Sequence, residues 1–99
     1  MSMIKWMRIK NICEDISGIT VHLHLSTDMP TDHIAGCEFT REGAHIILNA
    51  AQVKSLDMII RAISHELQHV LNGNKDHRID FDEKWVLLEK RISEEYSGK

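Results

Sequence analysis

Two histidines four residues apart flank a glutamate in the run His65-Glu66-Leu67-Gln68-His69. On a helix these histidines lie one turn apart on nearly the same face, so both imidazoles can bind one metal ion. Glu66 points about a quarter of a turn away, where it can take a proton from a metal-bound water without binding the metal. The spacing therefore predicts a zinc site with His65 and His69 as metal ligands and Glu66 as the catalytic residue.

The surrounding residues predict that this run lies on a helix spanning residues 55–72. Ser55 is a suitable N-cap, and Asn72-Gly73 is typical of a helix end. The side opposite the apolar stripe carries both histidines, so we expect them to face a cleft; the alternative is a solvated polar face. The apolar stripe at helical spacing consists of Leu56, Ile59, Ile60, Ile63, Leu67, Val70 and Leu71.

A catalytic zinc usually has three protein ligands and keeps one position for water, so a third ligand is expected after His69. His77 follows eight residues later in a polar loop, and Glu89 follows twenty residues later at the edge of an apolar stripe. Imidazole and carboxylate both bind zinc. We predict His77, because a histidine in that loop has no other evident role, and Glu89 stays the alternative.

The other histidines carry no predicted chemistry. His22 and His24 share one face of a predicted strand and could bind a metal together, but we interpret that face as solvated. His33 and His45 are single histidines without local partners. Tyr96 is expected to pack in the core, although it could instead reach the cleft as an oxyanion stabiliser.

The rest of the chain predicts the elements that position the motif. Strand 19–25 alternates between apolar residues and His22 and His24, and Glu42-Gly43 is expected to turn the chain between two later strands. The expected fold class is α+β, with one domain spanning residues 1–99. The predicted elements are a helix over 2–16, strands over 19–25, 35–41 and 44–49, the motif helix, and a last helix over 80–96.

Composition excludes several other classes of protein. The net charge is -3 and the basic residues are scattered, which disfavours a nucleic-acid partner. Cys13 and Cys37 form neither a disulfide framework nor a zinc-thiolate pattern, so both are expected to be reduced. The N-terminal residues contain no apolar run long enough for a signal peptide or a membrane span. We therefore expect a soluble cytoplasmic protein without a membrane partner.

Residues 63–73, Ile-Ser-His-Glu-Leu-Gln-His-Val-Leu-Asn-Gly, resemble the active-site helix of the zincin metallopeptidases. Among these the chain is most similar to the soluble minigluzincins and to the related catalytic domains of integral-membrane metallopeptidases. The resemblance implies a minimal zincin-like domain, Zn²⁺ at His65 and His69, Glu66 as general base and acid, and a peptide or unfolded protein as substrate. Zincins place an edge strand along the cleft, and residues 45–49 are expected to form it.

Minigluzincins are also latent, with a C-terminal segment blocking the cleft. Only three residues follow Tyr96 here. The resemblance therefore implies a homo-oligomer formed by exchange of the C-terminal helix in place of a free inhibitory tail.

Alternative functions remain open at this point. The region of His77 also resembles the end of the site in small DNA-repair proteases of the SprT kind. An endoribonuclease of the YbeY kind has three histidines ending in Asp-His, as in Asp76-His77, but glycine follows its first histidine where this chain has Glu66. A third possibility is a non-catalytic assembly module stabilised by a closed zinc site, for example with both His77 and Glu89 bound.

Overall fold

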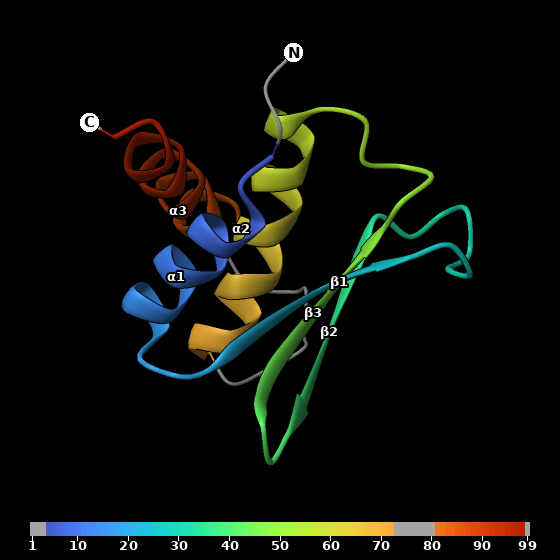
Figure 1. Ribbon diagram of the computed structural model, residues 1–99, viewed down its shortest axis with the longest axis horizontal. Coiled ribbons are helices and arrows are strands. Elements are labelled where there is room, and N and C mark those ends of the chain that lie inside the picture. The colour runs from blue at the N-terminus through green and yellow to red at the C-terminus, as the bar shows by residue number, and fades with distance from the viewer. Residues whose placement is uncertain (1–3, 73–80, 99) are drawn as a thin grey trace.

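The computed structural model describes residues 4–72 and 81–98, which form three helices and a three-stranded sheet (Figure 1). The α+β class and the predicted order of elements are confirmed. The predicted third ligand, His77, lies outside the described residues. The elements are α1 (Trp6–Ser17), β1 (Val21–Ser26), β2 (Ala35–Thr40), β3 (Gly43–Asn49), α2 (Leu56–Asn72) and α3 (Phe81–Tyr96).

The strand order in the sheet is β1-β3-β2, with β3 parallel to β1 and antiparallel to β2. The predicted hairpin of the second and third strands is confirmed, although β3 already begins at Gly43. The expectation that residues 45–49 form an edge strand is wrong, because β3 pairs on both sides. The long loop after β1 lets β2 pair on the far side of β3, so β2 is an edge strand.

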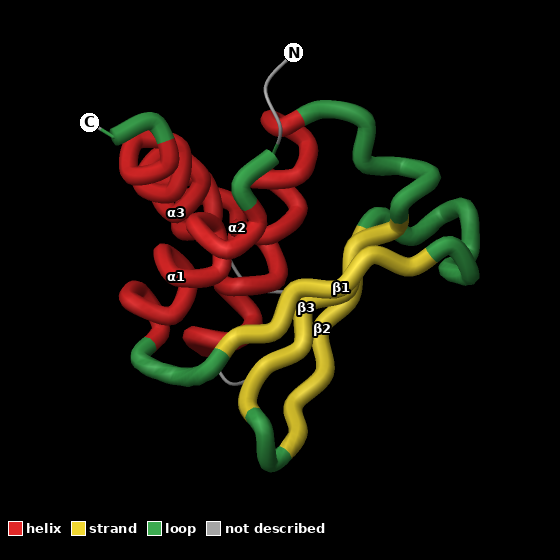
Figure 2. The backbone as a smooth tube through the Cα atoms, viewed as in Figure 1, coloured by secondary structure: helices red, strands yellow, loops and turns green. Residues whose placement is uncertain are grey.

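All three helices lie on one side of the sheet, and no described element covers the other side (Figure 2). The strands alternate accordingly: Ala44, Ile46 and Leu48 are fully buried towards the helices, while His45 and Ile47 point away from them. We call the uncovered side the outer face. Within the predicted stripe of α2, five residues are buried, Leu56 is half-buried, and Leu71 is 43% exposed near the helix end.

Two glycines fix the connections around α1 and β3. Gly18 ends α1 with a φ of 73°, and its N–H donates to the carbonyl oxygen of Glu14 at 2.8 Å. Gly43 has a φ of 123°, and a Cβ atom there would lie 2.2 Å from the backbone oxygen of Thr20. Ala44 N–H donates to that same oxygen at 2.9 Å. The turn and the start of β1 can therefore approach this closely only with glycine at position 43.

The side chain of Glu14 joins α1 to β1. Its Oε2 accepts hydrogen bonds from Lys10 Nζ at 2.8 Å and from the Val21 N–H at 2.9 Å. The ion pair with Lys10, followed by the Val21 hydrogen bond, holds the pKa of Glu14 below its usual value. Next to it, Cys13 is fully buried, and burial followed by the Glu14 charge raises the pKa of its thiol to about 12.

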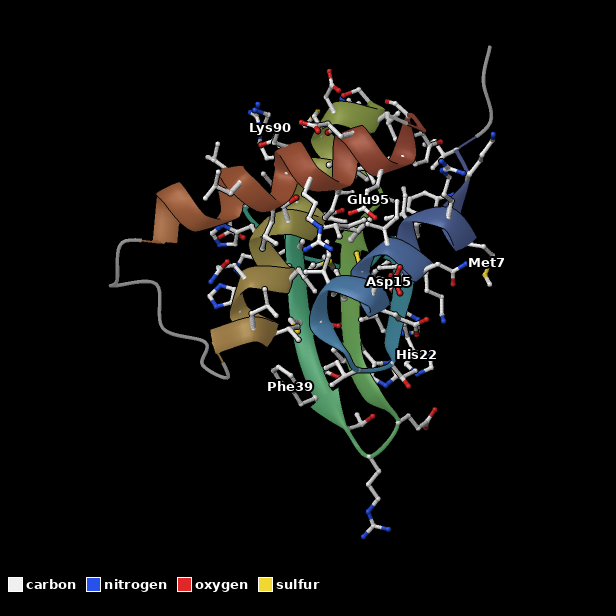
Figure 3. The ribbon with its side chains drawn as sticks, turned by 90° about the vertical axis from the view of Figure 1, so that its left-hand side faces the viewer. Met7, Asp15, His22, Phe39, Lys90 and Glu95 are labelled. Carbon is white, nitrogen blue, oxygen red and sulfur yellow. The ribbon has the colours of Figure 1, made fainter. Side chains whose placement is uncertain are left out.

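The first turn of α1 packs beside the last turns of α3 (Figure 3). The Tyr96 hydroxyl accepts a hydrogen bond from the Lys5 N–H at 3.0 Å, and the Arg8 guanidinium donates to the Glu95 carbonyl at 2.8 Å. Lys5 is the N-cap, so α1 begins at Trp6, four residues later than predicted. Across the described residues, no helix has the length and apolar character needed to cross a membrane.

Candidate metal centre

Helix α2 packs its apolar stripe in the core and presents His65 and His69 to a cleft. Ser55 caps it as predicted, since the Met58 N–H donates to Ser55 Oγ at 3.2 Å. The apolar stripe of α2 packs on the sheet and on α3. Ser64 is fully buried beside the motif, and its hydroxyl donates to the Ile60 carbonyl one turn earlier at 2.6 Å. The helix therefore presents the motif from a rigid element.

His65, Glu66 and His69 come together on α2, as the sequence predicts. Each offers one ligand atom, and these three atoms lie within 4.8 Å of one another. The two imidazole centroids are 5.1 Å apart, with ring planes at 71°. His69 is 3% exposed and Glu66 is 8% exposed, so the solvated polar face considered as an alternative does not describe this helix.

The donor set fits zinc on chemical grounds. Two imidazoles with a neighbouring carboxylate are donors that this ion prefers. Crossed ring planes let two nitrogens converge from different directions, as tetrahedral binding requires. The residues present therefore suit a zinc ion bound through His65 and His69, with Glu66 beside it.

The motif opens into a cleft of about 650 Å³, a size typical of ligand sites. One wall is α2, which contributes Met58, Arg61, Ala62 and the three motif residues. The other wall is residues 32–37, the end of a loop and the first half of β2. The edge strand along the cleft is thus β2, in place of the predicted residues 45–49.

Asn49 positions the loop that forms the rim of this cleft, a role that the sequence analysis did not predict. Its side chain is 1% exposed at the end of β3. Nδ2 donates to the carbonyl oxygens of Pro30 at 3.1 Å and His33 at 2.7 Å, and Oδ1 accepts from the Ala51 N–H at 3.1 Å. The Asn49 N–H also donates to the Ile34 carbonyl at 2.8 Å. An asparagine ending an apolar strand was the only signal in the sequence.

Glu89, the alternative third ligand, forms an ion pair with a residue of the cleft wall. Its Oε1 lies 3.6 Å from Arg61 Nε, and its side chain is 24% exposed. Glu89 is not part of the group formed by His65, Glu66 and His69.

Tyr96 was expected to pack in the core. Its hydroxyl accepts a hydrogen bond from the Lys5 N–H, and its ring packs against the core. The interpretation of Tyr96 as a packing residue is confirmed.

The sequence analysis found no local partner for His45 and predicted no chemistry there, but the folded chain gives it three partners. His45 Nδ1 lies 2.9 Å from His24 Nε2, and His45 Nε2 lies 2.9 Å from Thr40 Oγ1. Its ring also stacks on His22, with centroids 4.5 Å apart. The partners are distant in sequence and meet only through strand pairing. His33, which was also expected to have no local partner, lies 3.9 Å from the exposed carboxylate of Asp32 and is part of the cleft wall.

Comparison with known proteins adds no relative. No protein-family model matches the chain, and neither a curated protein nor a solved structure matches it. The function is therefore inferred from the residues of the cleft.

Proposed function

We propose that this protein is a small zinc-dependent endopeptidase, with zinc held by His65, His69 and a third ligand. The observation that supports this most strongly is the meeting of His65, Glu66 and His69 in a cleft whose opposite wall is an edge strand. A metal site built only for stability has no need of a cleft or of a buried carboxylate beside the ligands.

In this proposal, Glu66 acts first as general base and then as general acid. Its carboxylate accepts a proton from the attacking water and later delivers it to the nitrogen of the leaving amine. When bound, zinc supplies the Lewis acid that polarises the scissile carbonyl and lowers the pKa of a bound water towards about 7. Glu66 is 8% exposed, so its carboxylate is shielded from bulk solvent beside the two histidines, where a metal-bound water would lie.

The substrate in this proposal is a peptide or an unfolded segment of protein in extended form. It would lie along β2, which has one strand neighbour in the described sheet, and pair with its main chain as an added strand. Residues 35–37 of β2 lie directly across the cleft from the motif helix. An extended chain on β2 would therefore bring one of its peptide bonds near Glu66.

The first test measures zinc and proteolysis on the same samples. Wild-type protein loaded with zinc is expected to contain zinc and to cleave a fluorescently labelled unfolded protein until a chelator is added. Glu66→Gln should keep its zinc and lose cleavage. No zinc in wild type after incubation with excess metal, or full cleavage by Glu66→Gln, would contradict the proposal.

The third ligand is tested by removing each candidate. Zinc per chain is compared in wild type, His77→Ala and Glu89→Ala, with Glu94→Ala as a matched control at an exposed glutamate of α3. We expect loss of zinc in His77→Ala and retention in the other two. Loss of zinc only in Glu89→Ala would instead identify Glu89 as the third ligand. Glu89 already forms an ion pair with Arg61 of the cleft wall.

The same samples distinguish the alternative functions. Cleavage of RNA but not protein would favour a metal-dependent endoribonuclease, and stoichiometric zinc with neither activity would favour an assembly module or a latent peptidase. For latency we propose exchange of α3 between protomers, which gel filtration of freshly purified protein would detect as a dimer. Cys13 and Cys37 are not joined in a disulfide, which favours a cytoplasmic location in this proposal.

A further inference from the structure

A second group of metal-binding side chains lies on the outer face of the sheet, opposite the helices. Its members come from β1, from β3 and from the turn between β2 and β3. The face has no described element over it (Figures 1 and 2), so the group is separate from the cleft beside α2. None of its residues lines that cleft.

Strand pairing brings these side chains together. In the parallel register His22 on β1 lies directly opposite His45 on β3, and directly opposed residues place their side chains on the same face. His24 follows two residues later on that face. The three rings stack, with centroids 4.5 Å apart for His22 and His45 and 5.2 Å apart for His24 and His45.

The turn after β2 adds a carboxylate. One ligand atom each from His22, Glu42 and His45 lies within 4.8 Å of the other two. The close approach of Gly43 to Thr20 fixes this turn beside the start of β1, and His22 Nε2 lies 3.2 Å from the Glu42 carbonyl oxygen. We propose that His22, Glu42 and His45 form a second binding site for a divalent transition-metal ion, with Zn²⁺ as the first candidate.

The hydrogen bonds of His45 support this assignment. Metal-binding histidines usually use one ring nitrogen for the metal and the other for a hydrogen bond that fixes the ring. In His45 the two nitrogens have different partners, His24 at Nδ1 and the Thr40 hydroxyl at Nε2, each at 2.9 Å. Either arrangement leaves one partner to hold the ring while the other gives way to the ion. Whichever of His24 and Thr40 keeps its hydrogen bond to His45 is therefore the positioning residue.

The chemistry of the group selects the class of ion. Two imidazoles with one carboxylate suit Zn²⁺, Cu²⁺ and Ni²⁺ better than Ca²⁺ or Mg²⁺, which prefer sites made of oxygen. Glu38 lies opposite His45 on its other side, so further negative charge is close to the site. An ion bound here would connect β1 to the β2–β3 turn, and solvent would complete its coordination on this open face.

The test uses a variant without the cleft histidines. Its result therefore does not depend on whether the proposed peptidase function is correct. In His65→Ala/His69→Ala, calorimetric titration with Zn²⁺ is expected to show one saturable site per chain. Adding His22→Gln/His45→Gln should weaken this binding at least tenfold. Adding His33→Gln instead, which also removes one imidazole from an exposed position, should leave it unchanged.

A second measurement protects the test against misfolding. Circular dichroism in the presence of a chelator shows whether each variant is folded without metal. If His22→Gln/His45→Gln unfolds the chain, Glu42→Gln replaces it, because Glu42 is an exposed turn residue. Zn²⁺ should raise the thermal midpoint of the protein lacking the cleft site, and Glu42→Gln should reduce that shift. If His65→Ala/His69→Ala itself unfolds, the sheet substitutions are made in the wild-type background instead. His22→Gln/His45→Gln should then bind one zinc ion per chain fewer than wild type. Absence of saturable binding, or binding that the sheet substitutions leave intact, would overturn the proposal.

Discussion

Replacing Asn49 tests whether a single buried amide holds the rim of the cleft. Asn49→Ala removes three side-chain hydrogen bonds, to Pro30, His33 and Ala51, from a side chain that is 1% exposed. A net contribution of about 0.5–1.5 kcal/mol for each bond gives a total of about 1.5–4.5 kcal/mol. We expect the free energy of unfolding to fall by about 3 kcal/mol, near the middle of this range, because the freed loop carbonyls can form hydrogen bonds with water instead. For a chain of this size that loss lowers the thermal midpoint by roughly 12–24 °C.

Asn49→Asp sharpens the test because it changes charge with little change in shape. The aspartate can still accept from the Ala51 N–H, but an ionised oxygen would face two carbonyl oxygens in place of Nδ2. The folded protein should therefore raise the pKa of Asp at this position above its unfolded value of about 3.9. An acid with a raised folded pKa destabilises the protein as pH rises from the unfolded to the folded pKa. The variant should approach wild type near pH 3.5 and be least stable at neutral pH.

Urea unfolding of wild type, Asn49→Ala and Asn49→Asp at pH 3.5 and pH 7 would measure both effects. Gln52→Ala is the matched control, because its side chain donates one exposed hydrogen bond to the same loop, at the Thr31 carbonyl. We expect a loss below about 1 kcal/mol for this control. If Asn49→Ala loses no more than the control, or if Asn49→Asp is equally stable at both pH values relative to wild type, the assignment of Asn49 as the positioning residue is refuted.

Three further predictions concern other parts of the fold. Gly43→Ala should cost more than about 2 kcal/mol in urea unfolding, because its Cβ would meet the Thr20 oxygen at a positive φ; wild-type stability would contradict this geometry. Glu14→Gln should reduce stability at neutral pH by about 1 kcal/mol or less. That difference should vanish as pH falls through the lowered pKa of Glu14, and a constant difference would argue against its ion pair. A neutral thiol reagent, followed by mass spectrometry, should modify Cys37 in the folded protein and Cys13 only after unfolding; equal rates would disprove the burial of Cys13.

The sequence predicted most of the fold because most elements carry a local signal. The 3.6-residue stripe of α2, its cap at Ser55 and the alternation in β1 are all determined by neighbours in the chain. The start of α1 was predicted too early, since its true N-terminus is set by contact between Lys5 and Tyr96. Leu71 was predicted to be buried because it fits the stripe, but the helix extends beyond the core at that point.

The order of the strands in the sheet could not be predicted from the sequence, for a physical reason. Residues 45–49 directly precede the motif helix, which favoured an edge position beside it, but nothing local distinguishes an edge strand from a central one. The charged residue Glu38 within β2 was the weak signal of an edge strand. The partners of His45 were missed for the same reason, since His24 is 21 residues away and only the parallel register brings the two together.

The distribution of buried polar residues distinguishes the motif helix from an ordinary core helix. In the described chain the buried polar or charged residues are Ser64, Glu66, Gln68, His69 and Asn49. Four of them lie within six consecutive positions of α2, and the fifth holds the loop across the same cleft. Burying polar groups costs free energy that apolar residues would not. Two of these four, Glu66 and His69, line the cleft. A helix selected for stability alone would carry apolar residues at such buried positions, so these two favour chemistry at the cleft over packing.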